Sequence, residues 1–362
     1  MGRVYLYPEK STIEDLERNG LPLTALSARP YEELLTADQS GKFHAAVKIS
    51  VRDPYAKDFK AGAILEMSTP ENERELFRII KTTLTEITAT AWHISYDLRN
   101  YLISDRAWTE QTLAAAWPGI LQAGGANDFS GFSDVETVAG LRAVRRSVVD
   151  VTVDGNVSVV NRWGGELERH RFEVNMLSRR GTDRGFQVRY GQNLTGISDE
   201  VDTSEAYHAV LPTYLRGETV PVVMDVIKSP LYDFATEPRT VAIHFGDIRV
   251  GEEEDDYPTA QLAEQEVERR VASMWVQGAD KPRASAEINF VDLRRTGASA
   301  ELEEVFLGDT VRAIWEGHTD ITQRVVSYEW DSLADKYINI RLGDPEKSIE
   351  SLTNHRRYFA PK

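Results

Sequence analysis

The chain has 362 residues, of which 41% are hydrophobic and 28% charged, and its 58 acidic and 42 basic residues give a formal net charge of −16. This length predicts roughly two to four domains, and the composition is typical of a folded protein rather than a disordered one. The negative charge argues against a nucleic-acid clamp, which has to neutralise phosphates. The lack of cysteine excludes disulfides, thiolate metal sites and cysteine nucleophiles.

The sequence shows no sign of a membrane span or of Sec export. No apolar run approaches the roughly 18 residues that a membrane helix needs, and the N-terminal MGRVYLYPEK has neither an apolar core nor a small-residue cleavage site. A glycosylation sequon begins at Asn193, but it carries little weight without an export signal.

The N-terminal part predicts strands. In KFHAAVKISV, residues 42–51, apolar and polar side chains alternate, which is typical of a half-buried antiparallel strand. AILEM at 63–67 continues this pattern. The Thr- and Ile-rich stretch 75–95 predicts a hairpin that turns near 84–86, because β-branched side chains fit a pleated surface better than a helix. We therefore expect a first small β-barrel over residues 1–95.

The middle of the chain, residues 96–225, predicts an α+β insertion. One helical piece is expected to begin at Asp97, and a second to run from Thr109 to Trp117, with the threonine as its cap and Pro118-Gly119 as its stop. The stretch VTVDGNVSV at 151–159 fits either a tight hairpin or a short helix that precedes the turn.

Residues 163–197 predict a β-hairpin with a charged tip. Two runs of alternating apolar and polar residues flank a loop that holds Arg179, Arg180, Asp183 and Arg184. A loop with three arginines is usually a solvated surface. The functional alternative is a contact with an acidic partner or a neighbouring subunit, so these four residues are the candidate assembly contact.

The C-terminal half predicts a linker and helix region at 226–282, followed by strands. An acidic run at 251–258 precedes the clearest helical pattern of the chain, residues 259–276, where the acids come before the bases as the helix dipole favours. Four short strands with polar turns predict a second small β-barrel at 283–350, before a C-terminal tail at 351–362. The expected fold class is thus α+β and mainly β, with two small β-barrels and α+β domains between them.

No catalytic constellation stands out. The seven histidines show no zinc-binding spacing, and the sequence contains no nucleophile elbow, P-loop or dinucleotide-binding glycine motif. Glu166, Glu168 and His170 share one strand face by alternation, so a site is geometrically possible, although such a pattern is common on any solvent-facing strand. We expect no cofactor and no metal.

Six segments follow one another in a characteristic order. They are AWHISYDL (91–98), WGGELERHRFEV (163–174), RRGTDRGFQVRYGQNLTGI (179–197), KSPLYDF (228–234), VFLGDTVRAIW (305–315) and SYEWDSLADKYINIRLGD (327–344). In this order the chain resembles the baseplate-hub, or tail-associated, proteins of long-tailed bacteriophages, a group described as prophage endopeptidase tail or phage minor structural protein, N-terminal region.

The resemblance implies a structural hub at the tail tip of a virion, assembled in the host cytoplasm. Such proteins are homotrimers whose two β-barrels per subunit form a pseudo-sixfold ring that adapts a sixfold tail tube or distal tail protein to a threefold tip. The chain would contact the tape-measure protein and line or close the channel through which genomic DNA passes without specific binding. Since the last expected strand lies close to Lys362, a lytic or fibre module is expected on another chain.

Two other functions stay open. The family's name implies a tail endopeptidase or lysin, which would need a cleft with convergent polar groups. The seven Trp and fourteen Tyr also allow a protein that binds host-surface glycans. Trp315 lies in an alternating run and is expected in a core or an interface instead.

Overall fold

A computed structural model gives the fold of the chain. It describes residues 2–35, 41–83, 86–154, 157–189, 194–202, 206–217, 219–251, 257–276, 279–280, 283–290, 305–314 and 321–343. The chain divides into two compact units, in which unit 1 comprises residues 1–198 and 286–362 and unit 2 comprises residues 199–285.

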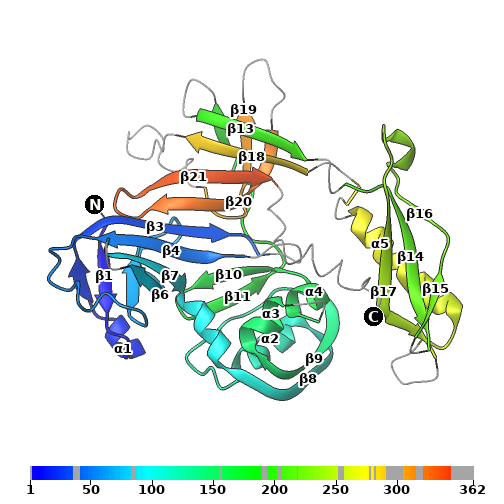
Figure 1. Cartoon of the computed structure of the whole chain (residues 1–362), viewed down its shortest axis with the longest axis horizontal. Helices are drawn as coiled ribbons and strands as arrows, with labels where there is room; N and C mark the ends of the chain where they lie inside the picture. The colour runs from blue at the N-terminus through cyan, green and yellow to red at the C-terminus, as the bar shows by residue number, and fades with distance from the viewer. Residues whose placement is uncertain are drawn as a thin grey trace. The chain divides into compact units, whose positions relative to one another are not determined.

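The N-terminal part of unit 1 is rich in strands, as predicted (Figure 1). It contains β1 (Val4–Tyr7), α1 (Ile13–Leu16), β2 (Leu21–Leu23), β3 (Ala25–Glu33), β4 (Phe43–Ile49), β5 (Ile64–Met67), β6 (Glu75–Thr83) and β7 (Thr88–His93). Strand β4 buries Phe43, Ala45, Val47 and Ile49, the apolar side of its alternation. The predicted hairpin of β6 and β7 is confirmed by their antiparallel pairing.

The structure describes six strands on the C-terminal side of unit 1, of which the last four confirm the prediction for residues 283–350. They are β12 (Phe186–Arg189), β13 (Leu194–Asp202), β18 (Arg283–Phe290), β19 (Thr310–Ile314), β20 (Ile321–Asp331) and β21 (Lys336–Gly343), of which β13 and β18 cross the boundary between the units. Strand β20 pairs antiparallel with β3, so both groups of strands belong to one thirteen-stranded sheet. The fold class, mainly β with helical additions, is confirmed. Within the described ranges the strand pairs do not close either group into a ring, so the two β-barrels stay a prediction. Trp315 lies outside the described residues.

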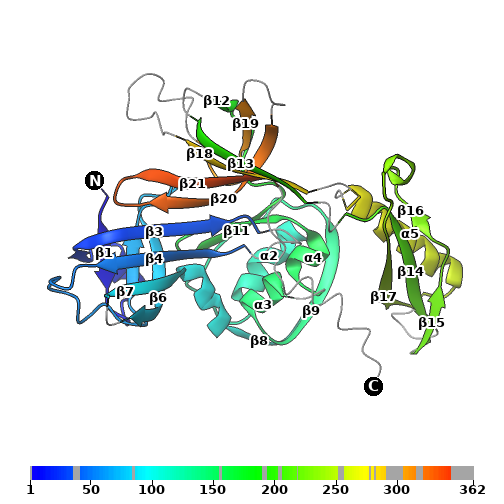
Figure 2. The same ribbon diagram turned by 45° about the horizontal axis from the view of Figure 1, so that its top comes forward.

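The insertion in unit 1 has both helices and strands (Figure 2). Its elements are the 3₁₀ helix η1 (Ile94–Asn100), β8 (Leu102–Thr112), α2 (Leu113–Gln122), β9 (Val138–Ser147), α3 (Val148–Val153), α4 (Val159–Trp163), β10 (Glu166–His170) and β11 (Glu173–Leu177). They enclose a core of their own that includes Trp117, Trp163 and Met176.

Two predictions for the helices of the insertion need correction. The helix expected from Thr109 begins at Leu113 instead, because residues 109–112 belong to β8 and Thr112 provides the cap by accepting a hydrogen bond from the Ala115 amide at 3.3 Å. Pro118 lies inside α2 and does not stop it, since the burial of Trp117 and its neighbours keeps the helix packed on the core. Of the two alternatives for residues 151–159, the short helix before the turn is confirmed by α3.

The hairpin predicted over residues 163–197 is wrong. Strand β11 pairs antiparallel with β10 across a turn at Arg171-Phe172, whereas β12 pairs in parallel with β19. The alternation in the sequence identified the strands and their buried faces, but alternation specifies a face and not a partner. The loop between β11 and β12 is therefore a crossing between two parts of unit 1, and Arg180 within it is buried rather than solvated.

Unit 2 is a helix packed on a small sheet. It contains β14 (Ala209–Arg216), β15 (Val220–Val223), β16 (Ile227–Lys228), the 3₁₀ helix η2 (Tyr232–Phe234), β17 (Thr240–Val250) and α5 (Ala260–Val276). The predicted helix at 259–276 is thus confirmed. Its buried face consists of Ala263, Val267 and Val271, which pack against the sheet. Leu262 is 45% exposed because, one residue before Ala263, it is turned away from the buried face of the helix.

We find no helix in the described part of the chain that has the length and apolar character to cross a membrane.

Candidate functional site

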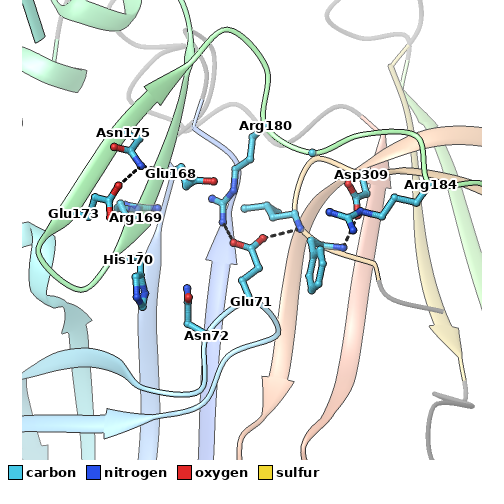
Figure 3. A pocket seen from close by; sticks show the side chains of 13 residues that line it. Glu71, Asn72, Glu168, Arg169, His170, Glu173, Asn175, Arg180, Arg184 and Asp309 are labelled. Carbon is cyan, nitrogen blue, oxygen red and sulfur yellow. Dashed lines mark hydrogen bonds and ion pairs between the residues drawn. The ribbon is translucent and has the colours of Figure 1, made fainter. Parts of the chain in front are cut away.

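A cavity of about 370 Å³ lies in unit 1 where four segments meet (Figure 3). These segments are the β10–β11 hairpin, the loop before β12, the connection from β5 to β6, and the loop before β19. The cavity is lined by Glu71, Asn72, Glu168, Arg169, His170, Glu173, Asn175, Arg180, Gly181, Arg184, Phe306, Leu307 and Asp309. Its size is within the range of ligand sites, but its lining is charged rather than apolar.

Arg180 forms the centre of a buried ion-pair network beside this cavity. Its Nη1 donates to Glu32 at 2.7 Å and its Nη2 donates to Glu71 at 2.6 Å, and the arginine side chain is only 3% exposed. The Tyr328 hydroxyl donates to the second oxygen of Glu32 at 3.0 Å. Because these groups come from β3, β20 and two loops, the network joins both strand groups of unit 1 to the loop that carries Arg180.

Burial and charge oppose each other in this network. Burial raises the pKa of Glu71, and the neighbouring guanidinium of Arg180 lowers it only in part. Burial acts to lower the pKa of Arg180, but the carboxylates of Glu32 and Glu71 outweigh it, so the guanidinium stays charged.

A second ion pair attaches β10 to β20. Arg324 donates to both oxygens of Glu166, at 2.7 and 2.8 Å, in the bidentate geometry that makes such pairs strong. The Arg180 amide also donates to Glu166 at 2.7 Å, and Arg324 donates to the Arg180 carbonyl at 2.8 Å. The backbone of Arg180 is therefore fixed as firmly as its side chain.

The loop that carries Arg180 lies against the loop before β19, and two glycines permit the close approach. A Cβ atom at Gly181 would lie 2.2 Å from the backbone carbon of Gly308, and both glycines have positive φ, at +72° and +87°. Only glycine tolerates both conditions. The short sequences RRGTDRG and FLGDT therefore need their glycines for packing between loops.

The four residues of the candidate assembly contact differ in their surroundings. Arg180 is engaged inside the protein, whereas Arg179, Asp183 and Arg184 are exposed. Arg179 donates to Thr310 Oγ1 at 3.1 Å, and Asp183 accepts from the Gly185 amide at 2.9 Å. Arg184 pairs with the buried carboxylate of Asp309 at 3.1 Å.

Glu166, Glu168 and His170, which share one side of β10 by alternation, each have a separate partner. Glu166 binds Arg324, Glu168 accepts from Asn175 Nδ2 at 3.1 Å, and His170 Nδ1 lies 3.0 Å from Glu75 Oε2. Glu168 and His170 line the cavity, and Glu166 does not.

A hydrogen-bonded chain of Glu75, His93 and Ser95 was missed by the sequence analysis. His93 Nε2 lies 2.8 Å from Glu75 Oε1, and its Nδ1 lies 2.8 Å from Ser95 Oγ, a sequence of groups found in serine hydrolases. The Ser95 amide also donates to Nδ1 at 3.2 Å, which makes Nδ1 the acceptor and leaves the Nε2 proton for the carboxylate. The predicted hairpin of β6 and β7 already brings Glu75 and His93 to the same end of two paired strands, but the sequence does not show that both side chains are buried.

The surroundings of these three hydrogen-bonded side chains indicate that they have a structural role. His93 is fully buried and stacks on Phe43 with ring centroids 4.4 Å apart, and Ser95 is 5% exposed. A nucleophile has to be accessible to its substrate, and Ser95 lines only a small cavity of about 50 Å³. Burial raises the pKa of Glu75, but His93 and His170 outweigh it and hold the pKa at about 2. Within the described ranges, no group of three histidine or acidic side chains is placed to hold a metal.

Both the sequence and the fold are similar to those of phage tail proteins. Residues 263–353 match a family model described as Prophage endopeptidase tail. The prophage tail protein gp18 of Listeria monocytogenes EGD-e is similar over 98% of both chains, with 15% identity and a TM-score of 0.57. The predicted resemblance to phage tail-associated proteins is thereby confirmed.

Two further tail proteins share this fold. The 43 kDa tail protein of prophage MuSo2 from Shewanella oneidensis matches 94% of this chain and 98% of its own, with 12% identity and a TM-score of 0.57. The tail protein of Neisseria meningitidis MC58 matches 96% of this chain and 97% of its own, with 11% identity and a TM-score of 0.55. No protein with a curated description matches the sequence. At identities of 11% to 15%, this similarity shows a shared fold and nothing more.

Proposed function

We propose that the chain is a structural hub at the tail tip of a phage or phage-like particle. The observation that carries this proposal is the fold, which matches three tail proteins, two of them from prophages, over at least 94% of this chain and 97% of theirs. The buried Glu75–His93–Ser95 chain supports a structural role over the endopeptidase in the family's name. We include in this proposal the two β-barrel domains that the sequence predicts, at residues 1–95 and 283–350.

The hub would act as a homotrimer. Three copies would place six barrels in a ring that joins a sixfold tail tube or distal tail protein to a threefold tip and contacts the tape-measure protein. Sheet edges would be covered by neighbouring copies, because exposed edges invite unwanted pairing. Three chains carry a formal charge of −48, three times −16, and surplus carboxylates along the channel would let genomic DNA slide without binding.

Arg179, Asp183 and Arg184 are the proposed assembly contact, with Arg180 as the residue that holds their loop in place. The three exposed side chains project from a loop that is fixed at Arg180 and at Gly181. A rigid loop loses little conformational entropy on association, which favours a contact there.

The mass of the purified full-length protein in solution tests the proposed function. One chain has a mass of 40.8 kDa, and light scattering after size-exclusion chromatography should give three times that value. The Arg179→Ala/Arg184→Ala variant should assemble less at the same concentration and keep the far-ultraviolet circular dichroism spectrum of the folded chain. Arg106→Ala/Arg145→Ala, which removes two exposed arginines of β8 and β9, is the matched control. A wild-type monomer at all concentrations contradicts the trimer, and an unchanged trimer in the first variant contradicts the contact.

A further inference from the structure

Phe234 in unit 2 is 85% exposed, more than any other large hydrophobic side chain in the part of the chain that the structure describes. A single exposed apolar residue is common on a protein surface, so its setting decides whether it has a function. Aromatic side chains are enriched at the centre of protein interfaces, where they fill a pocket of the partner. We therefore ask how the Phe234 ring is held and what could receive it.

The segment that carries Phe234 is fixed by its own hydrogen bonds. Ser229 is buried, and its amide donates to the His208 carbonyl at 2.8 Å. The amides of Phe234 and Ala235 both donate to the Leu231 carbonyl, at 3.0 and 3.1 Å. A ring that is held in place before a partner binds loses little conformational entropy on association, which is the property of an interface anchor.

A hollow of about 450 Å³ lies on the surface of unit 1, between the end of β1, the helix α1 and the start of β2. Its lining is mainly apolar. Pro8 is exposed and Leu21 is half-buried there, and the aliphatic stems of the exposed Lys10 and Arg18 add further apolar surface. A hollow of this size and character can receive a phenylalanine ring.

The charges beside the ring and beside the hollow are complementary. Asp233, the residue before Phe234, and Lys10 at the hollow are both exposed. Within the described ranges, neither forms an ion pair. Lys228, a cation of the same segment as Asp233, lies with its Nζ atom 4.1 Å from the centre of the Tyr232 ring. An exposed acid beside the ring and an exposed base beside the hollow would attract each other across an interface.

The other charges of the hollow already have partners. The carboxylate of Asp15 caps α1, where it accepts from the amide and the hydroxyl of Thr12 at 2.8 Å each. Arg18 pairs with Glu14 at 2.6 Å. Lys10 is therefore the group of this hollow that an incoming carboxylate would meet.

We propose that the Phe234 ring of one copy inserts into this hollow on a neighbouring copy, with Asp233 beside Lys10. Because the ring and the hollow are different surfaces, the contact is heterologous, and each copy uses its ring towards one neighbour and its hollow towards another. Three copies joined in this way close a ring. The number three rests on the proposed function, but the contact itself does not.

The strength of assembly tests the role of the ring. Light scattering of the full-length protein over a dilution series gives the concentration at which half of the complexes dissociate. Phe234→Ala should raise that concentration at least about tenfold, because it removes the anchor. Phe132→Ala is the matched control: it removes a phenylalanine that is 52% exposed in unit 1, and it should leave the value within about twofold.

An exchange of charges tests the pairing of Asp233 with Lys10. Lys10→Glu alone should weaken assembly, since it places two acids opposite each other. Lys10→Glu/Asp233→Lys should restore most of the loss, because the pair is present again with its charges reversed. Losses that simply add in the double variant would show that the two residues do not meet.

Photochemical cross-linking locates the partner of the ring. Phe234 is replaced by p-benzoylphenylalanine, which keeps an aromatic ring at this position and links to neighbouring C–H groups on irradiation. Light and ¹⁵N-labelled copies are mixed at high dilution, concentrated and irradiated, so that mass spectrometry separates links between copies from links within one chain. The expected link joins position 234 of one copy to residues 6–21 of another.

Three outcomes overturn the proposal: unchanged assembly in Phe234→Ala, a link that stays within one chain, and a link to any other segment. These failures differ from a failure of the hub. A trimer that ignores Phe234→Ala contradicts this contact alone. A link to residues 6–21 of another copy in a complex that is not a trimer contradicts the ring of three and keeps the contact.

Discussion

Unit 1 and unit 2 both contain arginines bound by two carboxylates, but in different environments. Arg180 in unit 1 is 3% exposed, and it joins segments that are far apart in the sequence. Arg270 in unit 2 is 28% exposed and pairs with Asp247 at 2.7 Å and with Glu266, on its own helix, at 2.8 Å. Water can reach the guanidinium of Arg270 but not that of Arg180, although Glu71 is 20% exposed at the cavity. The comparison indicates that losing the charge of Arg180 costs more stability than losing the charge of Arg270.

The largest decrease in the free energy of unfolding is expected for Arg180→Ala. The change removes the arginine that binds Glu71 and leaves Glu32 with only the more distant Arg169, 3.6 Å away, and breaking a buried pair costs about 3–5 kcal/mol. Urea denaturation of the full chain, followed for the transition of unit 1, measures the free energy of unfolding. The adjacent Arg179→Ala is the control and should change it by less than about 0.5 kcal/mol, because that side chain is exposed. Similar values for the two variants would mean that the burial of Arg180 does not set the cost of losing its charge.

A smaller loss of unfolding free energy is expected for Val267→Ala in unit 2. The valine is fully buried between α5 and the sheet, and two lost methyl groups together with the cavity left behind cost about 2 kcal/mol. Hydrogen exchange should show faster opening of α5 and β14 and unchanged protection in β6 and β7. Faster exchange throughout both units would mean that they unfold together.

Acid should test the buried Glu75 in unit 1. Its pKa in the folded protein is about 2, against an ordinary value of 4.5, so its stabilising effect is complete above 4.5 and is lost as the pH falls towards 2. Between pH 5 and pH 3.5 the wild type should lose about 1 kcal/mol more than Glu75→Gln. Urea denaturation at both values measures this difference, and parallel pH profiles would show that the carboxylate does not titrate as described.

The smallest effect is expected for Arg269→Ala in unit 2. Arg269 is 68% exposed and binds Glu266 three residues earlier on the same helix. Exposed pairs of this kind contribute about 0.5 kcal/mol or less, and salt should abolish the contribution. Denaturation at low and high salt provides the measurement. A loss as large as that of Arg180→Ala would mean that exposure does not separate the two classes of ion pair.

The sequence allowed the site to be predicted only in part. Arg179, Arg180, Asp183 and Arg184 were singled out by composition alone, but nothing in their spacing separates the buried arginine from the exposed ones. Glu32, Glu71 and Asn175 were not predicted at all. They lie on elements far apart in the chain, and a polar residue that is buried by tertiary packing looks the same in the sequence as one in solvent.

The sequence by itself determined several strands of unit 1, the helix α5 and the resemblance to tail proteins, because alternation, helical spacing and segment order are local properties of the chain. Only the tertiary structure decided that β11 pairs with β10 while β12 pairs with β19, and that Arg180 is enclosed by acids from two other segments. Pairing and burial depend on which distant segments come together, and the energy of a charge depends on whether water can reach it.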